Sequence, residues 1–172
     1  GPQDLAGMKF RVPNNPLWVE FFKKMGAAPT PMAFAEVYNA LQLKVIDGQE
    51  NPINIPVTAK FYEVQSFATM TNHMADGWVL GINPAKYNAL PEDQKKSIKE
   101  AAVEAEAWKV ENDAADEGKS IAALTEKGMK VDRLTPEQQK AFADVAKELF
   151  PTFAKLVKDQ AFFDRTIAAV SK

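Results

Sequence analysis

Residues 8–26 have the sequence MKFRVPNNPLWVEFFKKMG, which predicts a short strand followed directly by a helix. Mostly apolar residues fill the strand over 8–12, and Pro13 ends it because proline has no backbone N–H to give to a sheet. An asparagine at 14 or 15 can cap the helix, and Pro16 suits its first turn. The predicted helix then has apolar residues at helical spacing: Leu17, Trp18, Phe21, Phe22 and Met25.

The same alternation of extended and helical segments continues along the chain. Extended segments are predicted at 28–32, 45–48, 67–73, 77–82 and 129–133. Helices are predicted at 33–43, 83–90, 92–127, 136–157 with a bend at Pro151, and 159–172. Strands that alternate with helices indicate an α/β fold with a mainly parallel sheet.

The helix predicted over 92–127 is about three times the mean helix length. Its apolar residues form two stripes, Ile98-Ala101-Ala105-Trp108 and Val103-Ala107-Val110-Ala114. A helix with apolar residues on two sides is expected to be buried on both, as a strut between two packed bodies.

The composition argues against several classes of protein. The 172 residues include 21 basic and 23 acidic side chains, and no run of five like charges offers nucleic acid a basic surface. No apolar stretch is long enough to span a membrane. There is no cysteine and only one histidine, His73, which excludes thiol chemistry and multi-histidine metal sites. The common enzyme motifs are also missing, so we expect no enzyme, no metal and no cofactor.

Arginine is rare in this chain, with only Arg11, Arg133 and Arg165 among the 21 basic residues. Arg11 lies near the end of the first predicted strand, and ligands of open α/β sheets dock beyond the carboxyl ends of strands. Its planar guanidinium matches a carboxylate with two parallel hydrogen bonds. A structural ion pair is the alternative explanation.

Three other features are open to two interpretations each. The polar segment 47–52 follows a strand and can supply contacts to a small polar ligand, or it can be an ordinary turn. Phe34 and Tyr38 can lie in the core or against a ligand. His73 can be a structural histidine or a catalytic base.

Several segments together resemble one family, the extracytoplasmic solute receptors of TRAP transporters, of the DctP type. The resemblance covers residues 4–172. It is carried by MKFRVP at 8–13, GAAPTPMAFAEVYNALQ at 26–42, VIDGQENP at 45–52, KFYEVQ at 60–65 and TNH at 71–73. It implies a lobe like those of type II periplasmic binding proteins, with a mainly parallel sheet and a long connecting helix.

The resemblance also implies a function and a site. Family members are two-lobed periplasmic receptors that close around an organic acid and deliver it to a membrane permease. It implies that Arg11 pairs with the ligand carboxylate, that Asn51 helps to hold it and that Phe34 packs on the ligand. Glu50 and His73 match polar positions near this clamp, and Asn14 faces the same cleft.

The resemblance further implies how the chain is divided. Residues 3–76 and 117–172 would form the second lobe, and 77–116 a strand and the long helix that belong to the first lobe and the inter-lobe strut. Most of the first lobe would precede Asp4, so we expect a partial receptor with weak or no binding. Gly1-Pro2 resembles the remainder of a cleaved tag outside the fold. No signal peptide is visible, although the resemblance implies a periplasmic location.

An incomplete first lobe would expose apolar residues at a sheet edge, namely Trp78, Val79, Leu80 and Ile82. Exposed edges recruit another chain, so we expect a homo-oligomer or a domain-swapped dimer. Two other functions stay open: an α/β assembly module without ligand capture, and an enzyme that uses Glu50 or His73 as acid and base. The sequence does not select among a dicarboxylate, a keto or hydroxy acid, an aromatic acid and a sugar acid.

Overall fold

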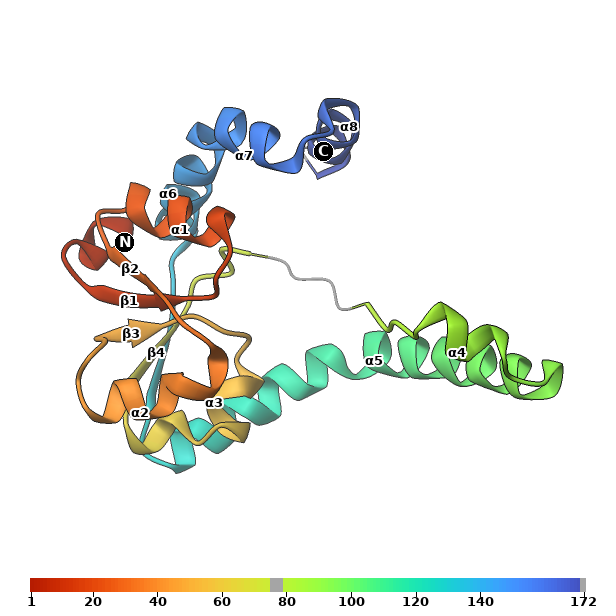
Figure 1. Ribbon diagram of the computed structural model, residues 1–172. Coiled ribbons are helices and arrows are strands. Elements are labelled where there is room, and N and C mark those ends of the chain that lie inside the picture. The colour runs from red at the N-terminus through yellow and green to blue at the C-terminus, as the bar shows by residue number, and fades with distance from the viewer. Residues whose placement is uncertain (75–78, 171–172) are drawn as a thin grey trace.

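Two parallel sheets organise the computed structural model, which describes residues 1–74 and 79–170. In the first sheet, β1 (Lys9–Val12) lies between β2 (Ala28–Pro31) and β3 (Gly48–Gln49). In the second sheet, β4 (Phe67–Met70) pairs with β5 (Lys130–Arg133), so two segments far apart in the sequence lie side by side (Figure 1). Every strand pairing among the described residues is parallel. The predicted α/β class with a mainly parallel sheet is confirmed.

Helices cover both faces of the first sheet (Figure 1). On one face, α1 (Pro16–Lys24) packs against α6 (Pro136–Glu148) and α7 (Phe150–Val157). On the other face lie α2 (Val37–Gln42) and α3 (Asn54–Thr58). The helix predicted to bend at Pro151 is two helices, because α6 ends at Glu148 and the proline lies in the first turn of α7.

The remaining elements are short or terminal. Three 3-10 helices, η1 (Pro2–Leu5), η2 (Phe34–Glu36) and η3 (Phe61–Glu63), join the larger elements, and α8 (Gln160–Val170) packs against α7. The expectation that Pro2 lies outside the fold is wrong, because this residue is buried and begins η1.

Two hydrophobic clusters fix the sheet between these helices. One joins β1 to α1 and α6 and includes Val12, Phe21, Phe22 and Phe142; the other joins α2 to η3 and includes Val37, Ile46 and Phe61. Gly48 allows β3 to approach β1, because a Cβ atom at this position would lie 2.8 Å from a ring carbon of Phe10.

Side-chain caps begin two of the helices where the sequence predicts. Asn15 Oδ1 accepts a hydrogen bond from Leu17 N at 3.0 Å at the start of α1. At the start of α6, Thr135 Oγ1 accepts from Gln138 N at 3.3 Å, and Gln138 Oε1 accepts from Thr135 N at 2.9 Å. This reciprocal pair is a capping box, which satisfies backbone donors that the helix cannot pair internally.

Thr135→Ala should lower the free energy of unfolding by about 1 kcal/mol, because it removes the acceptor for the Gln138 N–H. Thermal and urea unfolding followed by circular dichroism measure this loss. Thr166→Ala is the matched control, since Thr166 is exposed within α8 and its loss should change stability by less than about 0.5 kcal/mol. Equal losses from both variants would contradict the role of the cap.

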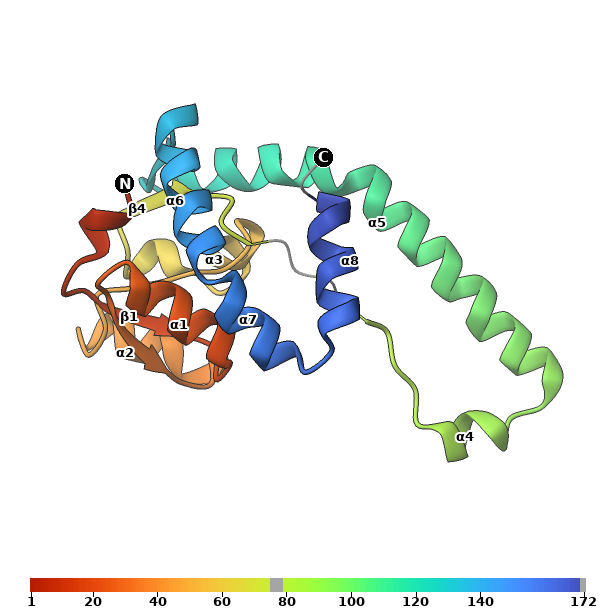
Figure 2. The same ribbon diagram turned by 90° about the horizontal axis from the view of Figure 1, so that it is seen from above.

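The long helix, α5 (Glu92–Glu126), forms an arm that projects from the sheets with α4 (Pro84–Asn88) near its far end (Figures 1 and 2). Only its C-terminal part packs, against α3 and β5. The prediction that this helix is buried on two sides is wrong, because Val103, Trp108 and Val110 are 66%, 59% and 75% exposed. None of the described helices is both long and apolar enough to cross a lipid bilayer.

The strand predicted at 77–82 is wrong where it can be judged, because residues 79–82 lie in neither a strand nor a helix. Its apolar side chains are nevertheless exposed as expected: Val79 is 92%, Leu80 82% and Ile82 51% exposed. Trp78 lies outside the described residues.

Candidate ligand-binding site

An open groove of about 2040 Å³ crosses the molecule where β1 and β3 end and where the segment after β4 turns toward α1. Parallel strands bring their carboxyl ends to the same edge of a sheet, which places side chains from distant segments together. The groove is larger than the pockets that usually enclose a small ligand. Five of the six predicted site residues line it: Arg11, Phe34, Glu50, Asn51 and His73.

Asn14 is the exception among the predicted residues. It is exposed in the turn between β1 and α1, and it is not among the residues that line the groove. The neighbouring Asn15 is occupied as the cap of α1. The structure therefore brings five of the predicted side chains together and leaves Asn14 apart.

Arg11 is only 5% exposed, and among the described residues it is the one buried charged side chain. Its Nε and Nη2 both donate to the carbonyl of Met32, at 3.2 and 3.0 Å. One N–H of Nη2 and both of Nη1 remain for other partners, because a guanidinium has five donors. No carboxylate of the described chain forms an ion pair with it. Burial lowers the pKa of Arg11 and the Glu50 carboxylate opposes this, but a guanidinium stays charged at neutral pH.

Phe34 lies beside this cation. Its ring centroid is 6.0 Å from Arg11 Cζ, and the ring contacts Phe61 with a centroid distance of 6.0 Å. Phe34 is 47% exposed, so one part of the ring packs and the other is open to the groove. The arrangement offers a ligand an apolar surface next to a positive charge.

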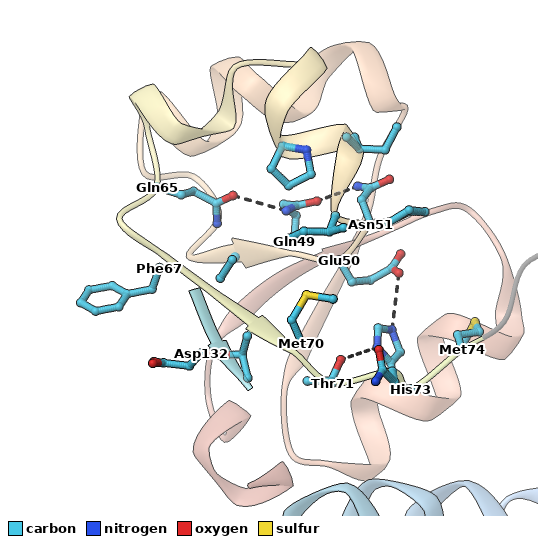
Figure 3. Close-up of a pocket in the computed structure, with 18 of the residues that line it drawn as sticks. Gln49, Glu50, Asn51, Gln65, Phe67, Met70, Thr71, His73, Met74 and Asp132 are labelled. Carbon is cyan, nitrogen blue, oxygen red and sulfur yellow. Dashed lines mark hydrogen bonds and ion pairs between the residues drawn. The ribbon is translucent and has the colours of Figure 1, made fainter. Parts of the chain in front are cut away.

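Glu50 and His73 face one another across the groove (Figure 3). His73 Nε2 lies 3.5 Å from Glu50 Oε2, and both side chains are 14% exposed. His73 Nδ1 shares a hydrogen bond of 2.6 Å with Thr71 Oγ1, and the ring stacks on Phe21 at 5.7 Å. Nε2 is buried without a hydrogen bond among the described residues. These contacts of His73 therefore hold the Glu50 carboxylate in the same part of the groove as Arg11.

Three amide side chains form a row next to Glu50 (Figure 3). Asn51 Nδ2 donates to Gln49 Oε1 at 2.6 Å, and Gln49 Nε2 donates to Gln65 Oε1 at 3.4 Å. In this arrangement Asn51 keeps its Oδ1 and one N–H for a ligand. Gln49 and Gln65 were not predicted as site residues, although each ends or lies within a motif that carries the family resemblance.

No group of three or more acidic or histidine side chains in the described part of the chain could hold a metal ion. Around Arg11 the groove offers a buried cation, amide donors and acceptors, the Glu50 carboxylate and an aromatic surface. This set is suited to the binding of a small anion with further polar groups.

Comparison with known proteins assigns the chain to a family. Residues 1–156 match the model of the DctP family, described as bacterial extracellular solute-binding protein, family 7. The chain belongs to this family. DctP-family members are solute-binding proteins rather than enzymes, and the resemblance seen in the sequence is confirmed.

Individual relatives of this DctP-family chain support the same family assignment. It is 40% identical to the 2,3-diketo-L-gulonate-binding periplasmic protein YiaO of Escherichia coli over 83% of the chain and 43% of the relative. The structure of the ectoine-binding protein of the TeaABC TRAP transporter of Halomonas elongata is 31% identical, with a TM-score of 0.86 over 98% of this chain and 56% of that one. The structure of the TRAP solute-binding protein RD1_1052 of Roseobacter denitrificans, with bound L-galactonate, is 39% identical, with a TM-score of 0.74 over 87% and 49%.

These matches confirm the predicted type of fold, since the neighbours are TRAP periplasmic binding proteins. The chain spans about half the length of the relatives it matches. The predicted roles of the six site residues and the predicted lobe boundaries stay predictions.

Proposed function

We propose that this chain is part of the solute-binding component of a TRAP-type secondary transporter, which captures an organic-acid anion for delivery to a membrane permease. The observation that carries the proposal is Arg11, a buried guanidinium at the groove with unused donors and no acidic partner among the described residues. A buried cation without a counter-ion is costly, and a ligand carboxylate would compensate for that cost.

Each side chain of the groove then has a role. The outer nitrogens of Arg11 form two parallel hydrogen bonds with the ligand carboxylate, and the Met32 carbonyl holds the guanidinium in place. Asn51 adds a polar contact and Phe34 an apolar surface. Glu50 and His73 complete the polar environment. Asn14 contributes only when a partner surface closes over the exposed turn between β1 and α1.

We propose a periplasmic location for this activity, which is supported by relatives that are named as periplasmic binding proteins. We propose that residues 3–76 and 117–172 form the second lobe, and that 77–116 contribute the long helix to the first lobe and the strut. A closing lobe would exclude water and strengthen the bonds to the carboxylate. With about half the length of its relatives, the chain is expected to bind weakly.

A nuclear magnetic resonance titration tests the proposal, because it detects weak binding. L-galactonate should shift the backbone amide signals of Arg11, Phe34 and Asn51, which line the groove. Galactitol is the matched control, since it keeps the carbon skeleton and hydroxyl groups but has no carboxylate, and it should leave these signals in place. Equal shifts with galactitol, or none with L-galactonate and the other acids of a panel, would contradict capture of an organic acid and favour an assembly module.

The exposed apolar residues of the arm support a second copy of this chain as a partner. Val79 and Leu80 are 92% and 82% exposed, and Trp108 and Val110 are exposed on α5. We expect two copies to cover these residues mutually, in a dimer or a domain-swapped pair. Light scattering should show a mass that rises toward twice 19.0 kDa with concentration. In Leu80→Ser the rise should move to higher concentration. A mass of 19.0 kDa at every concentration would contradict the dimer.

A further inference from the structure

The basic side chains that line the groove differ in whether an acidic side chain already pairs with them. Lys109, Lys119 and Arg133 also line the groove, but each forms an ion pair with an acidic side chain of α5. Their partners are Asp113, Asp116 and Glu117, respectively. Among the described lysine and arginine side chains of the groove, Arg11 alone has no such partner. A second ligand carboxylate would compete with one of these acids for its cation.

The groups beside Arg11 offer two acceptors of hydrogen bonds, the Glu50 carboxylate and the Asn51 Oδ1, together with one free N–H of Asn51. The Glu50 carboxylate acts on Arg11 through its charge and, at 14% exposure, is largely shielded from water. Asn51 donates one N–H to Gln49, which leaves its Oδ1 as an acceptor. A ligand hydroxyl satisfies such acceptors, whereas a second carboxylate has no hydrogen to donate at neutral pH.

A second carboxylate near Glu50 would also be repelled. Two like charges held close together at the edge of a protein repel one another, because the local dielectric screens them less than bulk water does. His73 Nε2 lies 3.5 Å from Glu50 Oε2, and the other side chains that pack on the His73 ring are the aromatic residues Phe21 and Phe22 of α1. Those two rings provide no charge that could offset the repulsion.

We propose that the ligand of this groove is a monocarboxylate with hydroxyl groups along its chain, a hydroxy acid or sugar acid, and that Glu50 discriminates against dicarboxylates. This inference rests on the proposed function, because it assigns the single carboxylate to Arg11. Gln49 and Gln65 are positioning residues, which hold the Asn51 amide with its oxygen free to accept a ligand hydroxyl.

L-galactonate and galactarate test the proposal as a matched pair, because they share the first carboxylate and four hydroxyl groups and differ only at the far end, where galactarate has a carboxylate in place of the terminal hydroxymethyl group. Titrations followed by amide signals should give at least about tenfold tighter binding of L-galactonate, which corresponds to about 1.4 kcal/mol. Hexanoate, which has the carboxylate but no hydroxyl, should also bind at least about tenfold more weakly.

Glu50→Gln removes the charge and keeps the shape, so the preference for L-galactonate over galactarate should fall to within about threefold. Glu126→Gln is the matched control on the exposed end of α5 and should keep the full preference. Melting curves of both variants establish that they fold. An unchanged preference in a folded Glu50→Gln variant would overturn the role of Glu50.

Two further outcomes separate this inference from the proposed function. Galactarate or hexanoate that binds as tightly as L-galactonate, with binding lost in Arg11→Ala, would overturn the inference while the receptor function stands. Acids that bind independently of Arg11, or do not bind at all, would overturn both.

Discussion

Arg11→Ala should weaken the binding of L-galactonate by about 2–5 kcal/mol, which is from about 30-fold to several thousand-fold. The loss is large because the charged hydrogen bonds lie in a site where Arg11 is 5% exposed, and the ligand carboxylate would be left there without a counter-ion. Amide signals monitored through a titration measure the change in affinity.

Arg11→Lys refines this expectation. Lysine keeps the positive charge, but its single nitrogen cannot serve the Met32 carbonyl and both oxygens of a carboxylate in the same planar geometry. Binding should therefore fall by at least about tenfold even though the charge is present. Arg165→Ala removes an exposed arginine of α8 and should leave the affinity unchanged. A lysine variant that binds like the original protein would show that only charge matters.

Phe21→Ala should lower the free energy of unfolding by about 3–5 kcal/mol, the largest effect on stability that we expect. The ring is 1% exposed, packs edge-on against Phe22 at 5.4 Å and stacks on His73 at 5.7 Å. For a chain of this length the loss corresponds to a fall of roughly 6–20 °C in Tm. Calorimetry and urea unfolding measure both quantities.

The matched control is Phe162→Ala, because Phe162 is 53% exposed on α8 and its removal should cost much less. Phe21→Leu should fall between the two, since leucine refills part of the cavity. Since Phe21 also supports His73, its alanine variant should perturb the amide signals around Glu50. Comparable losses for Phe21 and Phe162 would contradict the assignment of Phe21 to the core.

Local signals in the sequence predicted much of the fold. The strand at 8–12, the asparagine cap before Pro16 and the capping box at Thr135 all depend on residues a few positions apart. Local sequence pattern was not sufficient to predict the structure of segments whose state depends on whether other parts of the chain bury them. Residues 79–82 have the composition of a strand, but no strand of the described chain pairs with them. The apolar stripes of α5 likewise predicted burial, yet Trp108 is 59% exposed.

The sequence predicted several of the residues that form the candidate site but not the contacts that orient them. The family resemblance identified Arg11, Phe34, Glu50, Asn51 and His73, and the fold brings these five to one groove. The contacts that orient them could not be predicted, because they join segments that only the fold brings together. The Met32 carbonyl reaches Arg11 across 21 positions of sequence, and Gln65 reaches Gln49 across 16.

A crystal structure of the protein grown with L-galactonate tests the central claim most directly. We expect the carboxylate within hydrogen-bond distance of the outer nitrogens of Arg11, with a hydroxyl group toward Glu50 or Asn51. Arg11 would keep its bonds to the Met32 carbonyl. A carboxylate bound elsewhere in the groove, with Arg11 paired to Glu50 instead, would contradict it.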